Sequence, residues 1–196
     1  MDHDCKPRGA ARSGARSSRR RLLTRLAALP AALGLSFAME RESVAVTKEE
    51  ARWTKNTNVG AEGYSPDREE RAFLDLINAY RRKNGAGKLT LQKQLGEAAE
   101  HHSQDMANKN HFSHRLSNGD LPEENIERFG YTHWCYLGEN IAAGQETAKA
   151  VMRAWKSGRE HDRNMRNKNF TEIGIGRAYD RRSKYGWYWT TTFGSR

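Results

Sequence analysis

A seven-residue stretch, Gly138-Glu139-Asn140-Ile141-Ala142-Ala143-Gly144, sets one carboxylate among glycines and aliphatic residues. Ahead of it stands the run His111-Phe112-Ser113-His114, and behind it Trp155 is followed six residues later by His161. Glu139, His114 and His161 are far apart along the chain, so only the fold can bring them together. We predict that these three side chains converge on one cleft.

The chain on either side of this stretch divides into helical and strand patterns. Apolar residues recur at helical spacing in some segments and alternate with other residues in others. The expected elements are helices at 65–84, 90–109, 121–129 and 147–156 and strands at 131–137, 170–179 and 187–193. Ser65 and Thr90 are the predicted N-caps of the first two helices. This order predicts an α+β fold in which helices flank a small antiparallel sheet.

Two glycines interrupt the strand expected at 170–179. Gly174 and Gly176 alternate with Ile173 and Ile175. A glycine inside a strand often marks a place where another element approaches the backbone, so we expect a close contact here.

The first 38 residues have the features of an export signal. A basic region from Arg12 to Arg25 precedes the apolar run Leu26 to Ala38, which is shorter than the roughly 20 residues of a membrane-spanning helix. The motif from Ser18 to Leu23 resembles a twin-arginine signal. A disordered basic tail or a short membrane anchor is the alternative interpretation of this segment.

Composition confines the core to the rest of the chain. Hydrophobic residues make up 36% of the sequence, which is less than in most globular proteins. Residues 39–64 mix charged and small residues without a period, so we predict a linker there and a folded domain at 65–196.

The net charge of +10 suggests nucleic-acid binding at first sight. Of the 34 Lys and Arg and the 24 Asp and Glu, residues 1–38 hold 8 and 2 respectively. More than half of the excess positive charge therefore lies in the expected export signal. The remaining surface mixes both signs of charge, which argues against nucleic acid as a partner.

The residue types at the expected cleft suit a metal. His114 and His161 are predicted in loops, and Glu139 is predicted just past the end of the strand 131–137. Two imidazoles and a carboxylate are ligand types that zinc accepts, although their spacing matches no helical metal motif. Three separate surface residues are the alternative. His102 is expected to be a hydrogen-bonded core histidine rather than a ligand, and His101 is expected to be solvated.

From about Pro66 to the C-terminus the sequence resembles the CAP superfamily, also called SCP domains, and is most similar to its bacterial, cysteine-poor branch. Each matching fragment is weak alone, and together they follow one another in order over about 130 residues. They are His102-Ser103-x-Asp105-Met106, Phe112-Ser113-His114, Gly130-Tyr131, Gly138 to Gly144, Ala154-Trp155, His161-x-x-Asn164-Met165, Phe170 to Gly176 and Trp189 to Gly194.

The resemblance implies an α-β-α sandwich with two histidines and two glutamates in a central cleft, where some members bind zinc or another divalent cation. It maps His114, Glu139 and His161 onto three of these four positions. The fourth position holds Gly158, so the set is incomplete, and Glu160 in the adjacent segment is the remaining candidate for the cleft.

Three functions remain open at this stage. The first is a secreted, extracellular or cell-envelope binding module without enzymatic activity, which holds a divalent metal or a small-molecule, lipid or envelope ligand. The second is a metal-dependent hydrolase of peptides or esters that uses the same cleft, with Glu160 as the only candidate base. The third is a structural envelope protein whose cleft has no ligand.

Overall fold

The computed structural model describes residues 63–196, so the predicted export signal (1–38) and most of the predicted linker (39–64) lie outside the described residues. The elements in chain order are α2 (Arg68–Lys83), β1 (Thr90–Leu91), α3 (Lys93–Lys109), α4 (Pro122–Arg128), β2 (Tyr136–Ala143), α5 (Ala148–Ser157), α6 (Arg159–Arg166), β3 (Glu172–Tyr179) and β4 (Trp187–Ser195). No helix within this range has the length and apolar character needed to cross a membrane.

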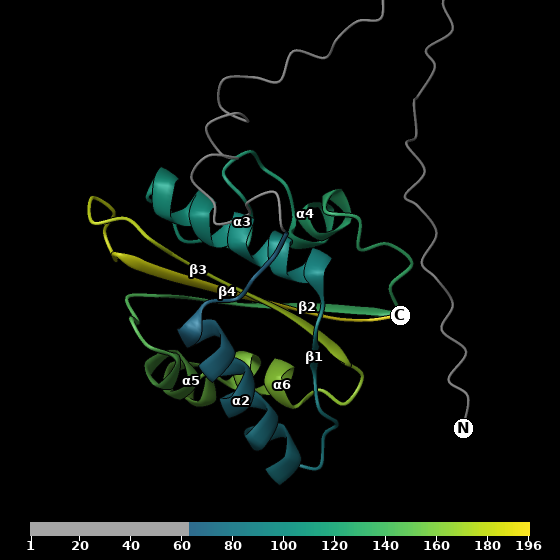
Figure 1. Cartoon of the computed structure of the whole chain (residues 1–196). Helices are drawn as coiled ribbons and strands as arrows, with labels where there is room; N and C mark the ends of the chain where they lie inside the picture. The colour runs from purple at the N-terminus through teal and green to yellow at the C-terminus, as the bar shows by residue number, and fades with distance from the viewer. Residues whose placement is uncertain (1–62) are drawn as a thin grey trace, which may run out of the picture.

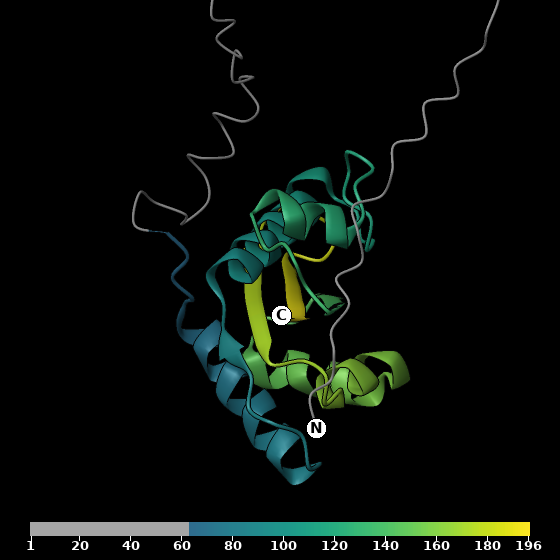
Figure 2. The same ribbon diagram turned by 90° about the vertical axis from the view of Figure 1, so that its right-hand side faces the viewer.

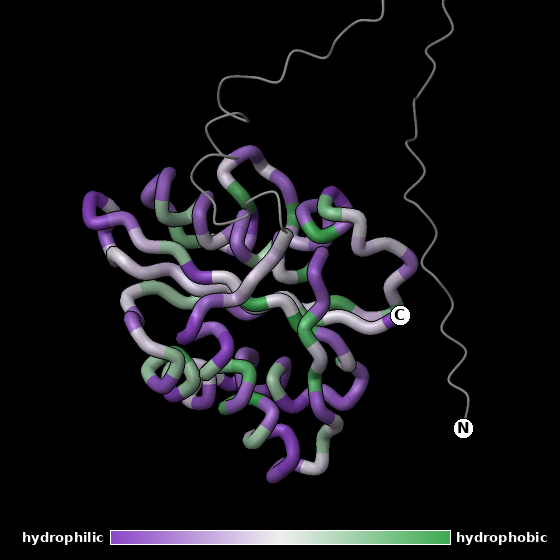
Figure 3. Tube along the Cα trace, in the orientation of Figure 1, coloured by the Kyte–Doolittle hydropathy of each residue, from purple (hydrophilic) through white to green (hydrophobic). Residues whose placement is uncertain are grey.

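The sheet lies between two layers of helices, which confirms the predicted α-β-α sandwich. The strand order is β1-β3-β4-β2, with β3 and β2 both antiparallel to β4 and the two-residue β1 parallel to β3. Helices α3 and α4 cover one face, and α2, α5 and α6 cover the other (Figures 1 and 2). The hydropathy of the residues agrees with this layered arrangement, because the turn that joins β3 to β4 is hydrophilic (Figure 3).

The helix starts differ from the prediction in two places. Asp67, rather than Ser65, caps α2, and its side chain and that of Glu70 form a reciprocal capping box. Thr90 does not cap α3, because Thr90 and Leu91 pair with β3 as the short strand β1. Gln92 then caps α3 by accepting a hydrogen bond from the Leu95 amide. Ser65 and Thr90 are both residue types that commonly cap helices. The neighbouring Asp67 caps α2 in place of Ser65, and pairing with β3 keeps Thr90 from capping α3.

The strand that precedes Glu139 is also shifted relative to the prediction. The structure places β2 at Tyr136–Ala143, so the Gly-Glu-Asn-Ile stretch is itself the strand, and the segment before it is mostly irregular. His133 in that segment has a left-handed backbone with φ of 57°, which breaks the predicted strand. Aromatic composition alone therefore misplaced the strand by about five residues.

The two glycines of β3 lie against α3, as predicted. A Cβ atom on Gly174 would come within 2.0 Å of the Leu95 carbonyl carbon, and one on Gly176 within 2.2 Å of the Glu100 amide nitrogen. Helix α3 therefore packs backbone to backbone on β3, and this contact fixes the position of every side chain that α3 contributes to the interior.

Candidate functional site

Glu139 occupies the middle of β2, not a position past a strand end, and its side chain is only 5% exposed. Two imidazoles hold its carboxylate. His102 Nδ1 lies 2.8 Å from Oε2, and His114 Nδ1 lies 2.7 Å from Oε1. The structure therefore brings together Glu139 and His114, as predicted, and adds His102, which the sequence analysis assigned to the core.

His102 is a fully buried link between α3 and the site. Its Nε2 lies 2.9 Å from the Ser113 carbonyl oxygen, which can only accept, so Nε2 carries a proton. Its Nδ1 faces the Glu139 carboxylate at 2.8 Å. The expectation of a hydrogen-bonded core histidine is confirmed. What the sequence did not show is that this histidine shares an acid with His114.

The pKa values of Glu139 and His114 shift in opposite directions. Burial alone would raise the pKa of Glu139, but the hydrogen bonds from His102 and His114 outweigh burial, so the pKa is lowered. The hydrogen bond that His114 donates to Glu139 raises the pKa of His114, against a smaller effect of burial. The site is therefore a buried carboxylate that stabilises the protonated form of a half-exposed imidazole.

His161 reaches the site from a helix rather than from a loop. It lies in α6, whose main chain is tied to β2 because Asn140 Nδ2 donates to the His161 carbonyl and Asn164 Nδ2 donates to the Glu139 carbonyl. Burial lowers the pKa of His161, and the nearby charge of His114 lowers it further. The pKa shifts of the two imidazoles therefore run in opposite directions.

The predicted metal set of His114, Glu139 and His161 does not assemble as three free ligands. Both oxygens of Glu139 already accept hydrogen bonds from imidazoles. Within residues 63–196, no group of three or more His, Cys, Asp or Glu side chains is arranged to hold a metal ion. The donors that fit a divalent cation are the outward nitrogen of His114 and the ring of His161, with Glu139 orienting His114 from behind.

Gly158, at the incomplete fourth position, lies against His161. A Cβ atom on Gly158 would come within 2.7 Å of His161 Nδ1, so a larger residue there would require this imidazole to shift. Glu160 does not replace the missing acid in this structure. Its side chain is 64% exposed and forms an ion pair with Arg163 on the outer side of α6.

A groove runs beside the outer edge of β2, next to these histidines. Its volume is about 260 Å³, and we call it the β2-edge groove. It is lined by Phe112, Ile141, Ala142, Ala143, Gln145, Ala154, Trp155, His161 and Tyr185. Most of these side chains are apolar or aromatic, and His161 links them to the polar group around His114. Such a surface is typical of a small-molecule site.

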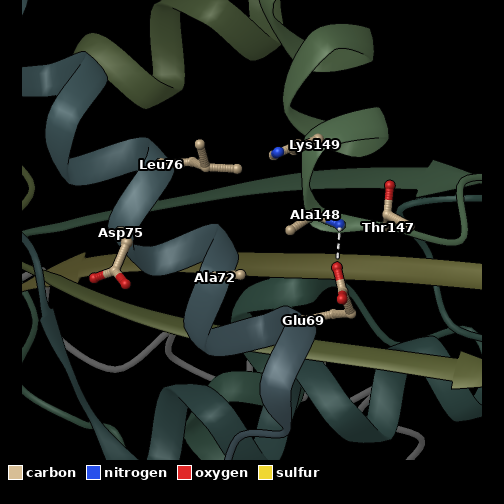
Figure 4. Close-up of a pocket in the computed structure, with 7 residues that line it drawn as sticks. All are labelled: Glu69, Ala72, Asp75, Leu76, Thr147, Ala148 and Lys149. Carbon is tan, nitrogen blue, oxygen red and sulfur yellow. Dashed lines mark hydrogen bonds between the residues drawn. The ribbon is translucent and has the colours of Figure 1, made fainter.

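A larger hollow lies away from the histidines. It measures about 510 Å³ between α2 and α5, and its lining includes Glu69, Asp75 and Leu76 (Figure 4). Glu69 points to the start of α5, where it accepts a hydrogen bond of 2.9 Å from the Ala148 amide. The carboxylate of Glu69 therefore serves as a helix cap, and we place the functional site at the smaller groove.

His101 is not solvated, which differs from the prediction. It is half-buried between α3 and α4, with Nδ1 2.6 Å from the Asn125 side-chain oxygen. Burial lowers the pKa of His101. Its role is to join the two helices, because Asn125 also donates to the Ala98 carbonyl.

The charge on His114 depends on Glu139, which gives a direct prediction. In Glu139→Gln, the pKa of His114 should fall to its ordinary value of about 6.5 or below, because only burial remains to shift it. The sign follows from the raised pKa: the interaction stabilises the fold below the ordinary pKa of histidine and is lost as pH rises through the folded value. NMR titration of the His114 ring protons measures this change.

The control for that titration is Glu160→Gln, which makes the same chemical change at an exposed acid of α6. It should leave the His114 titration unchanged. Equal midpoints in wild type and Glu139→Gln would show that the carboxylate does not charge the imidazole.

Comparison with known proteins identifies relatives of the folded domain. The model of the cysteine-rich secretory protein family, CAP, matches residues 74–193. YkwD of Bacillus subtilis (strain 168) is 36% identical over 124 residues, which are 63% of this chain and 46% of the relative. The membrane protein YlbC of the same organism is 32% identical over 107 residues, which are 55% of this chain and 31% of the relative. The chain spans less than half the length of these curated relatives.

Solved structures show the same architecture. An extracellular SCP-domain protein of Bacillus anthracis str. Ames superposes with a TM-score of 0.59 at 27% identity, over 65% of this chain and 40% of that one. An outer surface protein of Borrelia burgdorferi has a TM-score of 0.59 at 22% identity, over 68% of this chain and 98% of that one, and this likeness shows the fold alone. Because the family model covers more than half of the sequence, the chain belongs to the cysteine-rich secretory protein (CAP) family.

Proposed function

We propose that the protein is an exported binding module without enzymatic activity, which holds a small amphipathic ligand in the β2-edge groove. The observation that carries this proposal is the composition of the groove. Phe112 and Tyr185 supply exposed aromatic surface, the buried Trp155 also lines the groove, and His161 belongs to the same lining. An apolar cleft with a few placed polar groups binds molecules that have one apolar and one polar part.

The two imidazoles define the polar part of the ligand. The pKa of His114 is raised, so this ring keeps its proton to a higher pH than an ordinary histidine, whereas the pKa of His161 is lowered. The protonated ring of His114 favours a carboxylate or another anionic acceptor. The ligand we propose therefore has an apolar body and an anionic end.

A hydrolase that uses the same cleft would need a general base. Both oxygens of Glu139 are already held in hydrogen bonds with His102 and His114. Glu160, the other candidate, points outward in its ion pair with Arg163. A binding role uses these groups as the structure arranges them, whereas hydrolysis needs at least one of them to move.

Export of the chain remains part of the proposal. Its support is the N-terminal sequence pattern and the description of the Bacillus anthracis structure as extracellular and of the Borrelia burgdorferi protein as an outer surface protein. A binding groove of this kind would then face the cell envelope or the medium.

Filling the groove tests the proposal. Ala154 lines the groove from α5, so Ala154→Leu should weaken binding of the anionic aromatic probe anilinonaphthalene sulfonate by at least about tenfold, or about 1.4 kcal/mol. Ala150→Leu makes the same change on the same helix outside the groove and should bind like wild type. Amide NMR spectra locate the probe, and changes confined to other surfaces, or equal binding by both variants, would contradict the site.

The same spectra recorded with zinc chloride test the divalent-cation version of the proposal. A cation held by the two imidazoles should shift the ring signals of His114 and His161 and raise the melting temperature, since binding to the folded state stabilises it. No response at millimolar zinc would contradict cation binding, and the small-ligand proposal would still stand.

A further inference from the structure

We propose that the ligand of the β2-edge groove is a short extended peptide, which pairs with the open edge of β2 and directs its terminal carboxylate to His114. This inference rests on the function proposed above and names its ligand class. It follows from which backbone groups of β2 face the groove and which of them have partners.

The register with β4 decides which groups face outward. The amide of Gly144 donates to the Trp187 carbonyl at 2.8 Å, immediately beyond the pair of Ala143 with Tyr188. Because hydrogen-bonded pairs alternate in an antiparallel ladder, the even-numbered residues of β2 pair with β4. The amides and carbonyls of Glu139, Ile141 and Ala143 therefore point away from the sheet.

Two of the three outward carbonyls are already capped by side chains. Asn164 Nδ2 donates to the Glu139 carbonyl at 3.0 Å, and Trp155 Nε1 donates to the Ile141 carbonyl at 3.0 Å. Among the described residues, the amides of Ile141 and Ala143 and the carbonyl of Ala143 have no such partner. Both residues line the groove. The groove thus presents backbone donors and an acceptor with the spacing of a strand edge.

The opposite edge of the sheet is closed by contrast. On β3, the Ile173 carbonyl accepts from the Gln92 amide at 3.0 Å. The Tyr64 hydroxyl bonds both the carbonyl and the amide of Ile175, at 2.8 and 3.2 Å. The Arg177 amide donates to Glu70 Oε1 at 2.8 Å. Unpaired strand edges invite pairing with other chains, so the unpartnered amides of Ile141 and Ala143 beside the groove are where an added strand could pair.

The two ends of the open segment set the direction of the peptide. Gln145 lines the groove at one end, and its side-chain oxygen is buried without a partner within residues 63–196. This acceptor suits an N–H donor from the start of a peptide. At the other end, the half-exposed ring of His114, which Glu139 holds through Nδ1, can donate its other ring N–H to a terminal carboxylate. A peptide placed this way runs antiparallel to β2.

The size of the site limits the peptide to a few residues. Ile141 and Gln145 are four residues apart, which corresponds to about 14 Å of extended chain. Side chains of a paired peptide would lie beside the exposed rings of Phe112 and Tyr185, so these positions favour apolar residues. Acetyl-Ala-Leu-Ala-Leu with a free carboxylate has this length, direction and composition.

Amide hydrogen exchange with this tetrapeptide tests the pairing. At saturating peptide, exchange of the Ile141 and Ala143 amides should slow at least about tenfold, because each gains a hydrogen bond. Two analogues, N-methylated at one or the other alternate set of amides, serve as a matched pair. Only the set that faces β2 donates to the protein, so one analogue should lose at least about tenfold in affinity and the other should bind like the parent.

A protein variant supplies the complementary control. Ala143→Pro removes an outward amide that does not belong to the β2–β4 ladder, so the sheet should persist, whereas Ala143→Val keeps the amide and adds bulk. Ala143→Pro should weaken peptide binding by more than Ala143→Val does. If the naphthalene sulfonate probe binds the groove but the tetrapeptide does not, or both methylated analogues bind equally, strand pairing is wrong and the proposed function stands. If neither probe nor peptide reaches the groove, both fail.

Discussion

Replacing Arg81 with methionine should destabilise the domain by about 5 kcal/mol. Arg81 lies in the last turn of α2 and is completely buried. Its guanidinium donates to four carbonyls: Nε to Gly87 at 2.7 Å, Nη1 to Met165 and Asn167 at 2.9 Å each, and Nη2 to Phe170 at 2.9 Å. Burial lowers the pKa of Arg81.

The size of this loss follows from what methionine leaves behind. Methionine has a similar length and fills the space, so little cavity forms. Four carbonyls that join the end of α2, the end of α6 and the start of β3 would lose their donor, and each unsatisfied buried group costs about 1–3 kcal/mol. Domains of this size are stable by about 5–15 kcal/mol in total, so Arg81→Met should leave the protein close to unfolding.

Urea unfolding followed by tryptophan fluorescence measures this effect. Arg82→Met provides the matched control, since Arg82 is the next residue and is exposed, and its loss should stay within about 0.5 kcal/mol. Arg81→Lys should recover only part of the stability, because one ammonium cannot replace a planar fork of five donors. Equal midpoints for the Arg81 and Arg82 variants would show that the guanidinium does not hold these segments together.

Arg81 also shows where sequence reasoning stops. In the run Arg81-Arg82-Lys83, all three residues look like solvated cations at a helix end. Only the helical phase distinguishes Arg81, which falls four residues after Ile77 on the buried face of α2. Three of its four carbonyl partners belong to segments about 85 residues away, and no local pattern encodes a side chain–backbone contact of that range.

The candidate site was predictable in its members but not in their arrangement. His114, Glu139 and His161 were selected from residue types and from the family resemblance, and the structure brings the first two into contact. His102 could have been included, because its position on the apolar face of α3 requires a buried partner for its ring. That this partner is Glu139 depends on the register of β2 with β4 and on how α3 lies across the sheet.

The element boundaries failed where two signals competed. The aromatic segment before Gly138 has strand composition, yet the strand begins at Tyr136 and continues through the glycine and glutamate. Pairing with β4, whose sequence is an unambiguous strand, decided the outcome. Tertiary pairing commonly overrides local β-propensity.

The glycine contact in β3 gives the second large effect: Gly174→Ala should cost about 4 kcal/mol. The added methyl would lie 2.0 Å from the carbonyl carbon and 2.2 Å from the carbonyl oxygen of Leu95, and 2.3 Å from the amide nitrogen of Gly96. These atoms belong to the backbone of α3 and cannot rotate away. Ordinary overpacking costs about 1–3 kcal/mol because side chains can adjust, so a clash with a helix backbone should exceed that range.

Gly87→Ala is the control for this substitution. A Cβ atom on Gly87 would meet no atom within 4 Å, so alanine should be neutral or should stabilise by up to about 1 kcal/mol through the unfolded chain. Denaturant unfolding of both variants gives the comparison. A difference below about 1 kcal/mol would mean that α3 can move away from β3 without loss.

The same substitution should also disturb the candidate site, which separates a close helix contact from a merely unfavourable strand residue. Relief of the clash requires α3 to move away from β3, and α3 carries His102. His102 would then move relative to Glu139, while His114, which lies outside α3, would keep its hydrogen bond. In the folded fraction of Gly174→Ala we therefore expect the ring signals of His102 to shift more than those of His114. Unchanged His102 signals in a destabilised variant would place the strain in β3 and leave α3 where it is.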